Sequence, residues 1–360
     1  MRQDAEVVAA HTEERAAYAP ARVIRQPRAM RAWLFAVAGL VFAMIVVGGA
    51  TRLTGSGLSI TEWRPIMGAI PPLSKSDWQD AFAKYRQIPQ YQQLNKGMSL
   101  GQFKAIFWWE WTHRFLGRFI GVAFLLPFLY FVATRQVSRA LRTRLAGIFA
   151  LGGVQGAAGW YMVSSGLADR VSVSQYRLAL HLSLAMLIFG ALLWVAMTLD
   201  QRRPRTAAWS PTQKRAAFVL GAVFLQVILG ALVAGMKAGM AYNTWPLMDG
   251  QWIPTGLFVM HPWYANFFEN AMTVQFDHRV MAYLVFVAVL WHVWRTNHKP
   301  HGARVRSSAT VLAAAVLAQV ALGIWTLLAQ VPLPLGLVHQ AGAATVFGIA
   351  VWHLHAARAA

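Results

Sequence analysis

Two stretches of the sequence place a histidine and a polar side chain three residues apart at the start of an apolar run. The first is FWWEWTHR at residues 107–114, and the second is QFDHR at residues 275–279. Residues three apart share one face of a helix, so Glu110 and His113 can act on the same ligand. When the two His-Arg pairs are aligned, Gln275 stands opposite Glu110. Only the carboxylate can take up a proton, so we expect catalysis at the first copy, with Glu110 as its base. The alternative is that Glu110 only forms an ion pair with Arg114.

The composition is that of a membrane protein. The 360 residues are 57% hydrophobic and 13% charged, about half the charged fraction of an ordinary soluble domain. Eight apolar runs approach the roughly 20 residues that a helix needs to cross a bilayer. They lie near 32–50, 114–134, 145–164, 178–199, 216–236, 273–294, 308–329 and 336–356. The sequence therefore predicts an all-α polytopic membrane protein with eight transmembrane helices.

Basic residues explain the net charge of +20 without nucleic acid. They gather before the first run and in the short connections 135–144, 202–215 and 295–306. Basic short loops mark the cytoplasmic side of a membrane protein. We therefore expect a multi-pass protein of a bacterial inner membrane with both termini in the cytoplasm, the lipid bilayer as its surroundings and no nucleic-acid partner. The chain has no cysteine, which excludes disulfides and thiolate metal sites.

The second half of the chain repeats the first. His113 precedes His278 by 165 residues, Gln155 precedes Gln319 by 164, and His181 precedes His339 by 158. Three markers at nearly one offset predict two tandem four-helix bundles related by duplication, as in other membrane proteins. We expect a tail at residues 1–30, an N-terminal bundle at 31–200, a cytoplasmic linker at 201–215 and a C-terminal bundle at 216–360.

Four histidines stand in the first turns of the even-numbered runs: His113, His181, His278 and His339. Ionisable residues inside a membrane are costly and mark functional sites. A lone histidine would more often bond two helices together, but four at matched positions favour two facing pairs. Such pairs suit axial ligation of a haem inside each bundle, whereas zinc would need further ligands.

Two arginines are candidate partners of the haem propionates, because a guanidinium pairs well with a carboxylate. Arg114 follows His113 directly, and Arg177 precedes His181 by one helical turn. The alternative is that both side chains extend to the outer lipid headgroups.

Several motifs together resemble the haem A synthase family, in its cysteine-free form typical of proteobacteria and mitochondria. They are GGATRLTGSGLS at 48–59, EWTHR at 110–114, QGAAGWYMV at 155–163, YNTWP at 242–246, DHR at 277–279 and HQ at 339–340. The resemblance implies a haem b in the C-terminal bundle, its iron bound by His278 and His339. It also implies a haem O substrate site at His113 and His181, with Glu110 needed for activity.

The reaction that the resemblance implies is the oxidation of a methyl group of haem O to a formyl group. It would proceed by successive hydroxylations with water-derived oxygen and give haem A for cytochrome oxidase. The family further implies haem O synthase and cytochrome oxidase assembly factors as partners, and the chain is a possible homo-oligomer.

A different function follows from a second spacing. His292 lies 14 residues after His278, and His353 lies 14 residues after His339, which returns each to the same helix face about 21 Å away. Two such pairs could hold two haems, as in a bis-histidine di-haem electron-transfer cytochrome b. Against this, the N-terminal half has Pro127 at the matching position. We also expect His292 and His353 to be solvated at the cytoplasmic helix ends.

Overall fold

The computed structural model describes residues 28–64, 67–199 and 208–359, and almost all of the ordered backbone in them is helical. The predicted tail at 1–30 lies outside these ranges except for residues 28–30, and the predicted linker at 201–215 lies outside them at residues 201–207. The long helices are α2 (Arg28–Leu53), α5 (Leu100–Ala133), α6 (Arg139–Asp169), α7 (Gln175–Thr198), α8 (Pro211–Met236), α11 (Ala271–Asn297), α12 (Ala303–Leu328) and α13 (Leu333–Ala359). The short ones are η1 (Met67–Ala69), α3 (Lys75–Tyr85), α4 (Pro89–Leu94), α9 (Ala238–Ala241), η2 (Trp263–Ala265) and α10 (Asn266–Glu269).

Seven of the described helices are long and apolar enough to cross a membrane. They are α2, α5, α7, α8, α11, α12 and α13, which confirms an all-helical polytopic membrane protein. The remaining long helix, α6, coincides with the predicted run at 145–164. Its first turns hold Arg139, Arg142 and Arg144, which lowers its apolar character.

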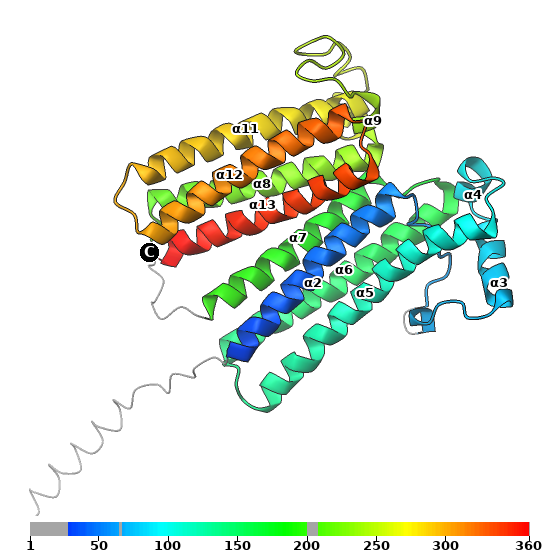
Figure 1. Cartoon of the computed structure of the whole chain (residues 1–360), viewed down its shortest axis with the longest axis horizontal. Coiled ribbons are helices and arrows are strands. Elements are labelled where there is room, and N and C mark those ends of the chain that lie inside the picture. The colour runs from blue at the N-terminus through cyan, green and yellow to red at the C-terminus, as the bar shows by residue number, and fades with distance from the viewer. Residues whose placement is uncertain (1–27, 65–66, 200–207, 360) are drawn as a thin grey trace, which may run out of the picture.

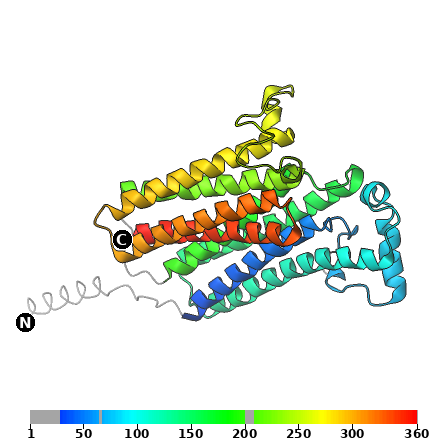
Figure 2. The same ribbon diagram turned by 45° about the horizontal axis from the view of Figure 1, so that its top comes forward.

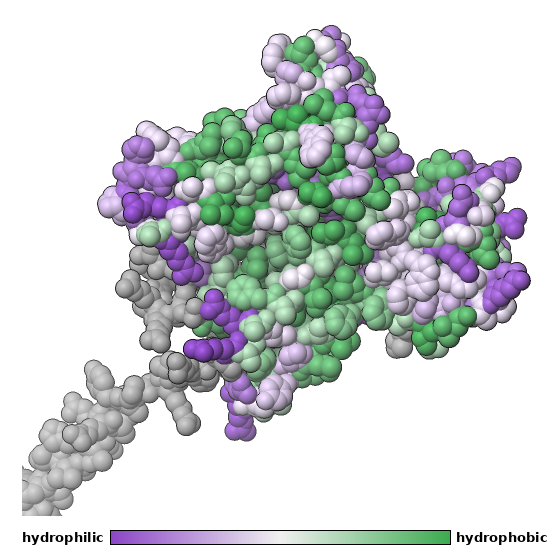
Figure 3. Space-filling view, viewed as in Figure 1, coloured by the Kyte–Doolittle hydropathy of each residue, from purple (hydrophilic) through white to green (hydrophobic). Residues whose placement is uncertain are grey.

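The long helices lie in two neighbouring groups (Figures 1 and 2). One group contains α2, α5, α6 and α7, and the other contains α8, α11, α12 and α13. The groups meet through α2, α7, α8 and α13, which pack on one another. One apolar core runs through both and includes Leu34, Leu192, Val223, Leu312 and Phe347. Apolar residues cover the middle of the visible face, and hydrophilic residues gather toward its ends (Figure 3).

Helix α5 begins earlier than the apolar run predicts. Ser99 accepts a hydrogen bond from the backbone N–H of Gln102, whose side chain in turn accepts from the N–H of Ser99. This capping box starts the helix at Leu100 rather than near residue 114. The 34-residue helix is therefore about 51 Å long, well beyond a hydrocarbon core of about 30 Å. The 107–114 motif, which opens the apolar run, therefore lies in the interior of a longer helix.

The segment between α2 and α5 folds into a compact cap beside the N-terminal part of α5. The polar stretch at 74–96 forms α3 and α4. A second apolar cluster, with Tyr85 and Phe103 fully buried, fastens these short helices to α5. Tyr85 also donates to Gln90 at 3.1 Å. The cap therefore gives residues 59–62 a fixed place against α5.

Candidate functional site

Each of the four motif histidines lies against a glycine of a neighbouring helix. The pairs are Gly48 with His113, Gly159 with His181, Gly230 with His278 and Gly323 with His339. A Cβ added to these glycines would stand 2.9, 3.0, 3.0 and 2.8 Å from the imidazole Cε1 atoms, respectively. Since ordinary Cβ atoms do not come that close, glycine is what lets each ring occupy its position.

The histidines form one pair in each helix group. The rings of His113 on α5 and His181 on α7 have centroids 6.4 Å apart. Metal–imidazole bonds are about 2 Å long, so two rings on opposite sides of one metal have centres roughly 6 Å apart. In the other group, His278 on α11 and His339 on α13 occupy the corresponding helices, and each lies against its own glycine. The spacing of the first pair fits axial ligation of one iron.

Glutamines contact three of these histidines, and they do so differently in the two groups. Gln226 Nε2 lies 3.0 Å from His278 Nδ1, and Gln319 Nε2 lies 3.1 Å from His339 Nδ1. Both amides also donate to the backbone carbonyl of the same histidine, at 3.0 and 2.8 Å. These contacts hold the Nδ1 side of both rings, as in metal sites where the second ring nitrogen has a partner. Gln226 Nε2 also lies 3.4 Å from His278 Nε2.

The N-terminal pair lacks these Nδ1 contacts. Gln155 Nε2 lies 3.3 Å from His181 Nε2, and the buried Nδ1 atoms of His113 and His181 have no hydrogen-bond partner. Within the described ranges no cluster of three or more histidine, cysteine or acidic residues could hold a bare metal ion. Two imidazoles at this spacing, with orphaned ring nitrogens, fit a metal that arrives inside a flat prosthetic group, such as haem.

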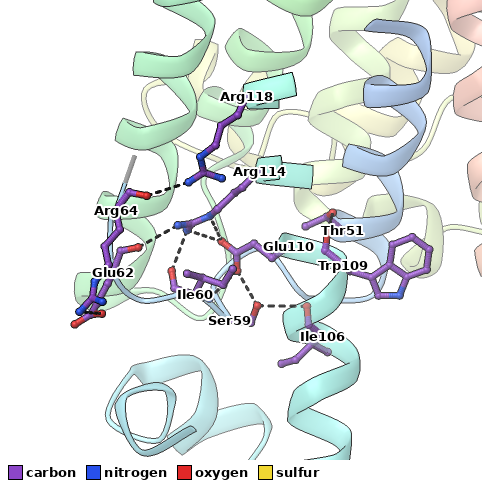
Figure 4. A network of polar contacts seen from close by, with 10 residues as sticks. All are labelled: Thr51, Ser59, Ile60, Glu62, Arg64, Ile106, Trp109, Glu110, Arg114 and Arg118. Atoms are coloured by element: carbon purple, nitrogen blue, oxygen red, sulfur yellow. Dashed lines mark hydrogen bonds and ion pairs between the residues drawn. The ribbon is translucent and has the colours of Figure 1, made fainter. Parts of the chain in front are cut away.

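Glu110 is the centre of a polar network between α5 and the cap (Figure 4). Its Oε1 accepts from Arg114 Nη2 at 2.6 Å and Nε at 3.0 Å. Its Oε2 accepts from Ser59 Oγ and the backbone N–H of Ile60, both at 2.8 Å. The residue is only 2% exposed. The i,i+4 pairing considered as the alternative is therefore present, and the carboxylate also holds residues 59 and 60.

Arg114 uses its other donors on the same segment. Its Nη2 donates to the Ile60 carbonyl at 2.9 Å, and its Nη1 donates to the Glu62 carbonyl at 3.1 Å. The Glu62 carboxylate accepts from Lys84 at 2.6 Å, which together with the charge of Arg64 lowers the pKa of Glu62. Arg114 stays a predicted propionate partner, but the structure commits its guanidinium to Glu110 and the cap.

Arg177 points instead from the N-terminal end of α7 toward α6. Its guanidinium contacts the hydroxyl of Ser165, donates to Tyr161 Oη at 3.3 Å and lies 4.5 Å from the centre of that ring. Neither of these two partners is acidic. Its charge is therefore positioned one helical turn from His181.

The C-terminal motif repeats the geometry of Glu110 and Arg114 without the carboxylate. Gln275 Nε2 and Arg279 Nη2 both donate to the carbonyl of Tyr242, at 2.6 and 2.9 Å. Tyr242 lies in the segment that follows α8 and α9, just as Ile60 follows α2. Both motifs thus fasten an inter-helix segment to the helix that carries a histidine, but only in the first is the residue three positions before the histidine an acid.

The expectation that His292 and His353 are solvated is wrong. They are 0% and 1% exposed, and their Nε2 atoms lie 2.7 Å apart. Ser308 Oγ lies 2.9 Å from His353 Nδ1. The helix ends pack together here, so the rings satisfy each other instead of water. Their direct contact is shorter than the roughly 4 Å spanned by two metal–imidazole bonds, which lends the di-haem alternative no support.

Sequence reasoning did not anticipate the partners that hold the site together. Gln155 and Gln319 were visible only as markers of the repeat, and Gln226 was not singled out. Each nevertheless stands four residues before the glycine that faces a histidine. That spacing puts amide and glycine on one helix face. It was the sequence signal from which the histidine partners could have been predicted. Nothing local in the sequence links Ser59 or Ile60 to Glu110.

Fold and site together define an integral membrane protein with two histidine pairs suited to haem, each enclosed by its own group of helices. Residues 31–351 match the family model described as cytochrome oxidase assembly protein (COX15-CtaA), and the chain belongs to that family.

Curated relatives are similar to this chain over most of its length. A heme A synthase of Parvibaculum lavamentivorans is 58% identical over 323 residues, covering 90% of this chain and 92% of the relative. A heme A synthase of Azorhizobium caulinodans is 54% identical over 333 residues, covering 91% of this chain and 94% of the relative. A heme A synthase of Mesorhizobium japonicum is 52% identical over 332 residues, covering 92% and 91%.

Proposed function

We propose that this protein is a haem A synthase, an oxidoreductase that converts haem O to haem A for cytochrome oxidase. The observation that carries the proposal is the buried histidine pair in each helix group, with the rings of His113 and His181 facing each other, in a chain that is 52–58% identical to heme A synthases. One pair would hold a resident haem and the other the substrate. An electron-transfer cytochrome would not need an acidic residue beside one histidine pair and not beside the other.

The C-terminal pair is our choice for the resident haem b. His278 and His339 would bind its iron, and the bound haem would carry electrons away from the reaction. The Nδ1 contacts of Gln226 and Gln319, at 3.0 and 3.1 Å, support this assignment. A histidine whose ring is held by a second contact is better oriented for a metal, as a permanent cofactor requires.

The N-terminal pair is our choice for the substrate site, with His113 and His181 as ligands of haem O. Arg177 is placed to bind a propionate, since its guanidinium lies near Tyr161 and Ser165 at the outer end of the site. A guanidinium and a carboxylate form strong charge-assisted hydrogen bonds. Because the donors of Arg114 are engaged elsewhere, the propionate proposal rests on Arg177.

Glu110 is the proposed catalytic residue. Each hydroxylation of the methyl group by water releases two protons and two electrons, and loss of water from the doubly hydroxylated carbon leaves the formyl group. Glu110 lies one turn before His113 on α5 and is a proton acceptor that the C-terminal copy lacks. General bases of this kind contribute about 10²–10⁴-fold to a rate.

We also propose that α6 is an eighth transmembrane helix and that the two groups arose by duplication, as bundles at 31–200 and 216–360. The matched glycine–histidine contacts in the two groups support this. The basic connections 135–144 and 295–306 would face the cytoplasm with both termini, and the cap would lie outside. The haem O supplier and cytochrome oxidase assembly factors are the proposed partners.

The test is expression in a host that makes haem O but no haem A, followed by extraction and mass spectrometry of the haems. The proposed function predicts haem A only in cells that carry the chain. A haem-loaded protein that leaves haem O unchanged would favour the electron-transfer alternative.

A further inference from the structure

One arrangement surrounds three of the four motif histidines, and the fourth histidine departs from it. In each of the three, a single helix presents a glycine to the ring and, four residues earlier, a glutamine whose amide reaches the same histidine. The sets are Gln226, Gly230 and His278; Gln155, Gly159 and His181; and Gln319, Gly323 and His339. At His113 the facing glycine is Gly48, and the residue four positions earlier is Met44.

Met44 occupies the place that Gln226 occupies in the other group. Helix α2 packs on α5 as α8 packs on α11, and each pair joins a glycine to a histidine. The Met44 Cε atom would lie 3.4 Å from a Cβ on Gly117, one turn beyond His113. The thioether therefore reaches across to α5. His113 Nδ1 is buried there without a hydrogen-bond partner.

The two side chains differ in what they can offer an imidazole. A carboxamide has both a donor and an acceptor, so it can hold Nδ1 whether or not that nitrogen carries the proton. A thioether has no donor and is a weak acceptor. Loss of a partner to the second ring nitrogen typically costs about 10–100-fold in metal affinity. Nδ1 of His181 also lacks a partner, but of the four histidines His113 is the one whose facing helix offers it no amide at all.

The packing of helix α6 also distinguishes the N-terminal site from the C-terminal one. Helix α6 packs less extensively on α5 and α7 than α12 packs on α11 and α13. The N-terminal site is therefore enclosed by fewer helix–helix contacts than its counterpart. A site with a weakly held ligand and a loosely packed wall suits a haem that must enter and leave.

We propose that Met44 is the positioning residue that makes the N-terminal site exchangeable. By leaving His113 unsupported, it lets haem O bind and haem A depart, whereas Gln226 at the matching position keeps haem b in place. The inference rests on the proposed function, because it takes His113 as a ligand of the substrate haem.

The chain supplies a reciprocal test. Full-length wild type, Met44→Gln, the apolar control Met44→Leu and the reverse exchange Gln226→Met are loaded with ferric haem b in detergent. Transfer of haem to excess apomyoglobin is then followed by absorbance. The phase that disappears in His113→Ala reports the N-terminal site. We expect Met44→Gln to slow that phase by about 10–100-fold, Met44→Leu to leave it unchanged, and Gln226→Met to hasten the other phase by a similar factor.

The proposal would be overturned if haem left the N-terminal site at equal rates in Met44→Gln and Met44→Leu. If Met44→Gln does not fold, the Gln226→Met variant provides the test. An unchanged rate of haem b loss in that variant would then refute the proposal. These rates require no turnover. Wild type that makes no haem A while the rates change as expected would therefore refute the proposed function and leave the inference about Met44 standing.

Discussion

Replacing Glu110 by glutamine separates its two possible roles, because the structure shows what the carboxylate holds. Glutamine has nearly the same shape and can still accept from Ser59 and the N–H of Ile60. Its amide group would then face the Arg114 guanidinium, which loses an anion at 2.6 Å. The side chains are 3% and 12% exposed, so water replaces little of the lost interaction.

The size of this loss follows from the contacts that remain. Removing one partner of a buried ion pair costs roughly 3–5 kcal/mol. Arg114 keeps its bonds to the carbonyls of Ile60 and Glu62, so we expect about 2–3 kcal/mol for Glu110→Gln, below that range. Loosening should be confined to the cap and the outer part of α5, and hydrogen exchange there is the measurement.

Activity then distinguishes a base from an anchor. The double variant Glu110→Gln with Arg114→Gln carries no unpaired charge, so it should recover part of the lost stability, with Arg114→Gln alone as the baseline. If Glu110 is the base, the double variant still forms haem A at least about 100-fold more slowly than wild type, while the haem b spectrum is unchanged. Haem A formation near the wild-type rate in the double variant would refute the catalytic role and leave Glu110 as an anchor.

Further variants test the assignment of the haems and the topology. His278→Ala should abolish the low-spin haem b signal in reduced-minus-oxidised spectra, whereas His113→Ala should retain it and lose haem A formation; an intact signal in the first variant contradicts the assignment. His353→Ala leaves a buried imidazole without its partner, which costs about 1–3 kcal/mol, so the thermal midpoint should fall while the haem b signal persists. Gln93→Cys, in the exposed cap, should react with an impermeant thiol reagent from outside, and Thr143→Cys only from the cytoplasm; the reverse labelling refutes the orientation.

Much of the fold could be predicted because it depends on local composition. Seven of the predicted apolar runs are long apolar helices, since a membrane span needs about 20 apolar residues in succession. Helix boundaries were predicted less accurately where polar or basic residues extended a helix beyond its apolar run. Ser99 and Gln102 begin α5 well before its apolar run, and the basic first turns of α6 make it less apolar than its neighbours.

The site was predictable only in part, for a related reason. The types and spacing of the four histidines indicated two haem sites, and the motifs indicated the family, which the comparison confirms. The expectation for His292 and His353 failed because helix ends rich in arginine look exposed in sequence. Whether the last turns of α11 and α13 pack together depends on residues far apart in the chain.

By itself, the sequence determined that this is a helical membrane protein with repeated histidine motifs, since hydropathy and short motifs are properties of adjacent residues. Only the tertiary structure decided which side chains support each histidine. Gln226 lies 52 residues from His278, Ser59 lies 51 residues from Glu110, and Met44 stands where a glutamine would be expected. Such partners meet because packed helices bring distant positions within hydrogen-bonding distance, and that distance is set by the packing rather than by the residues between them.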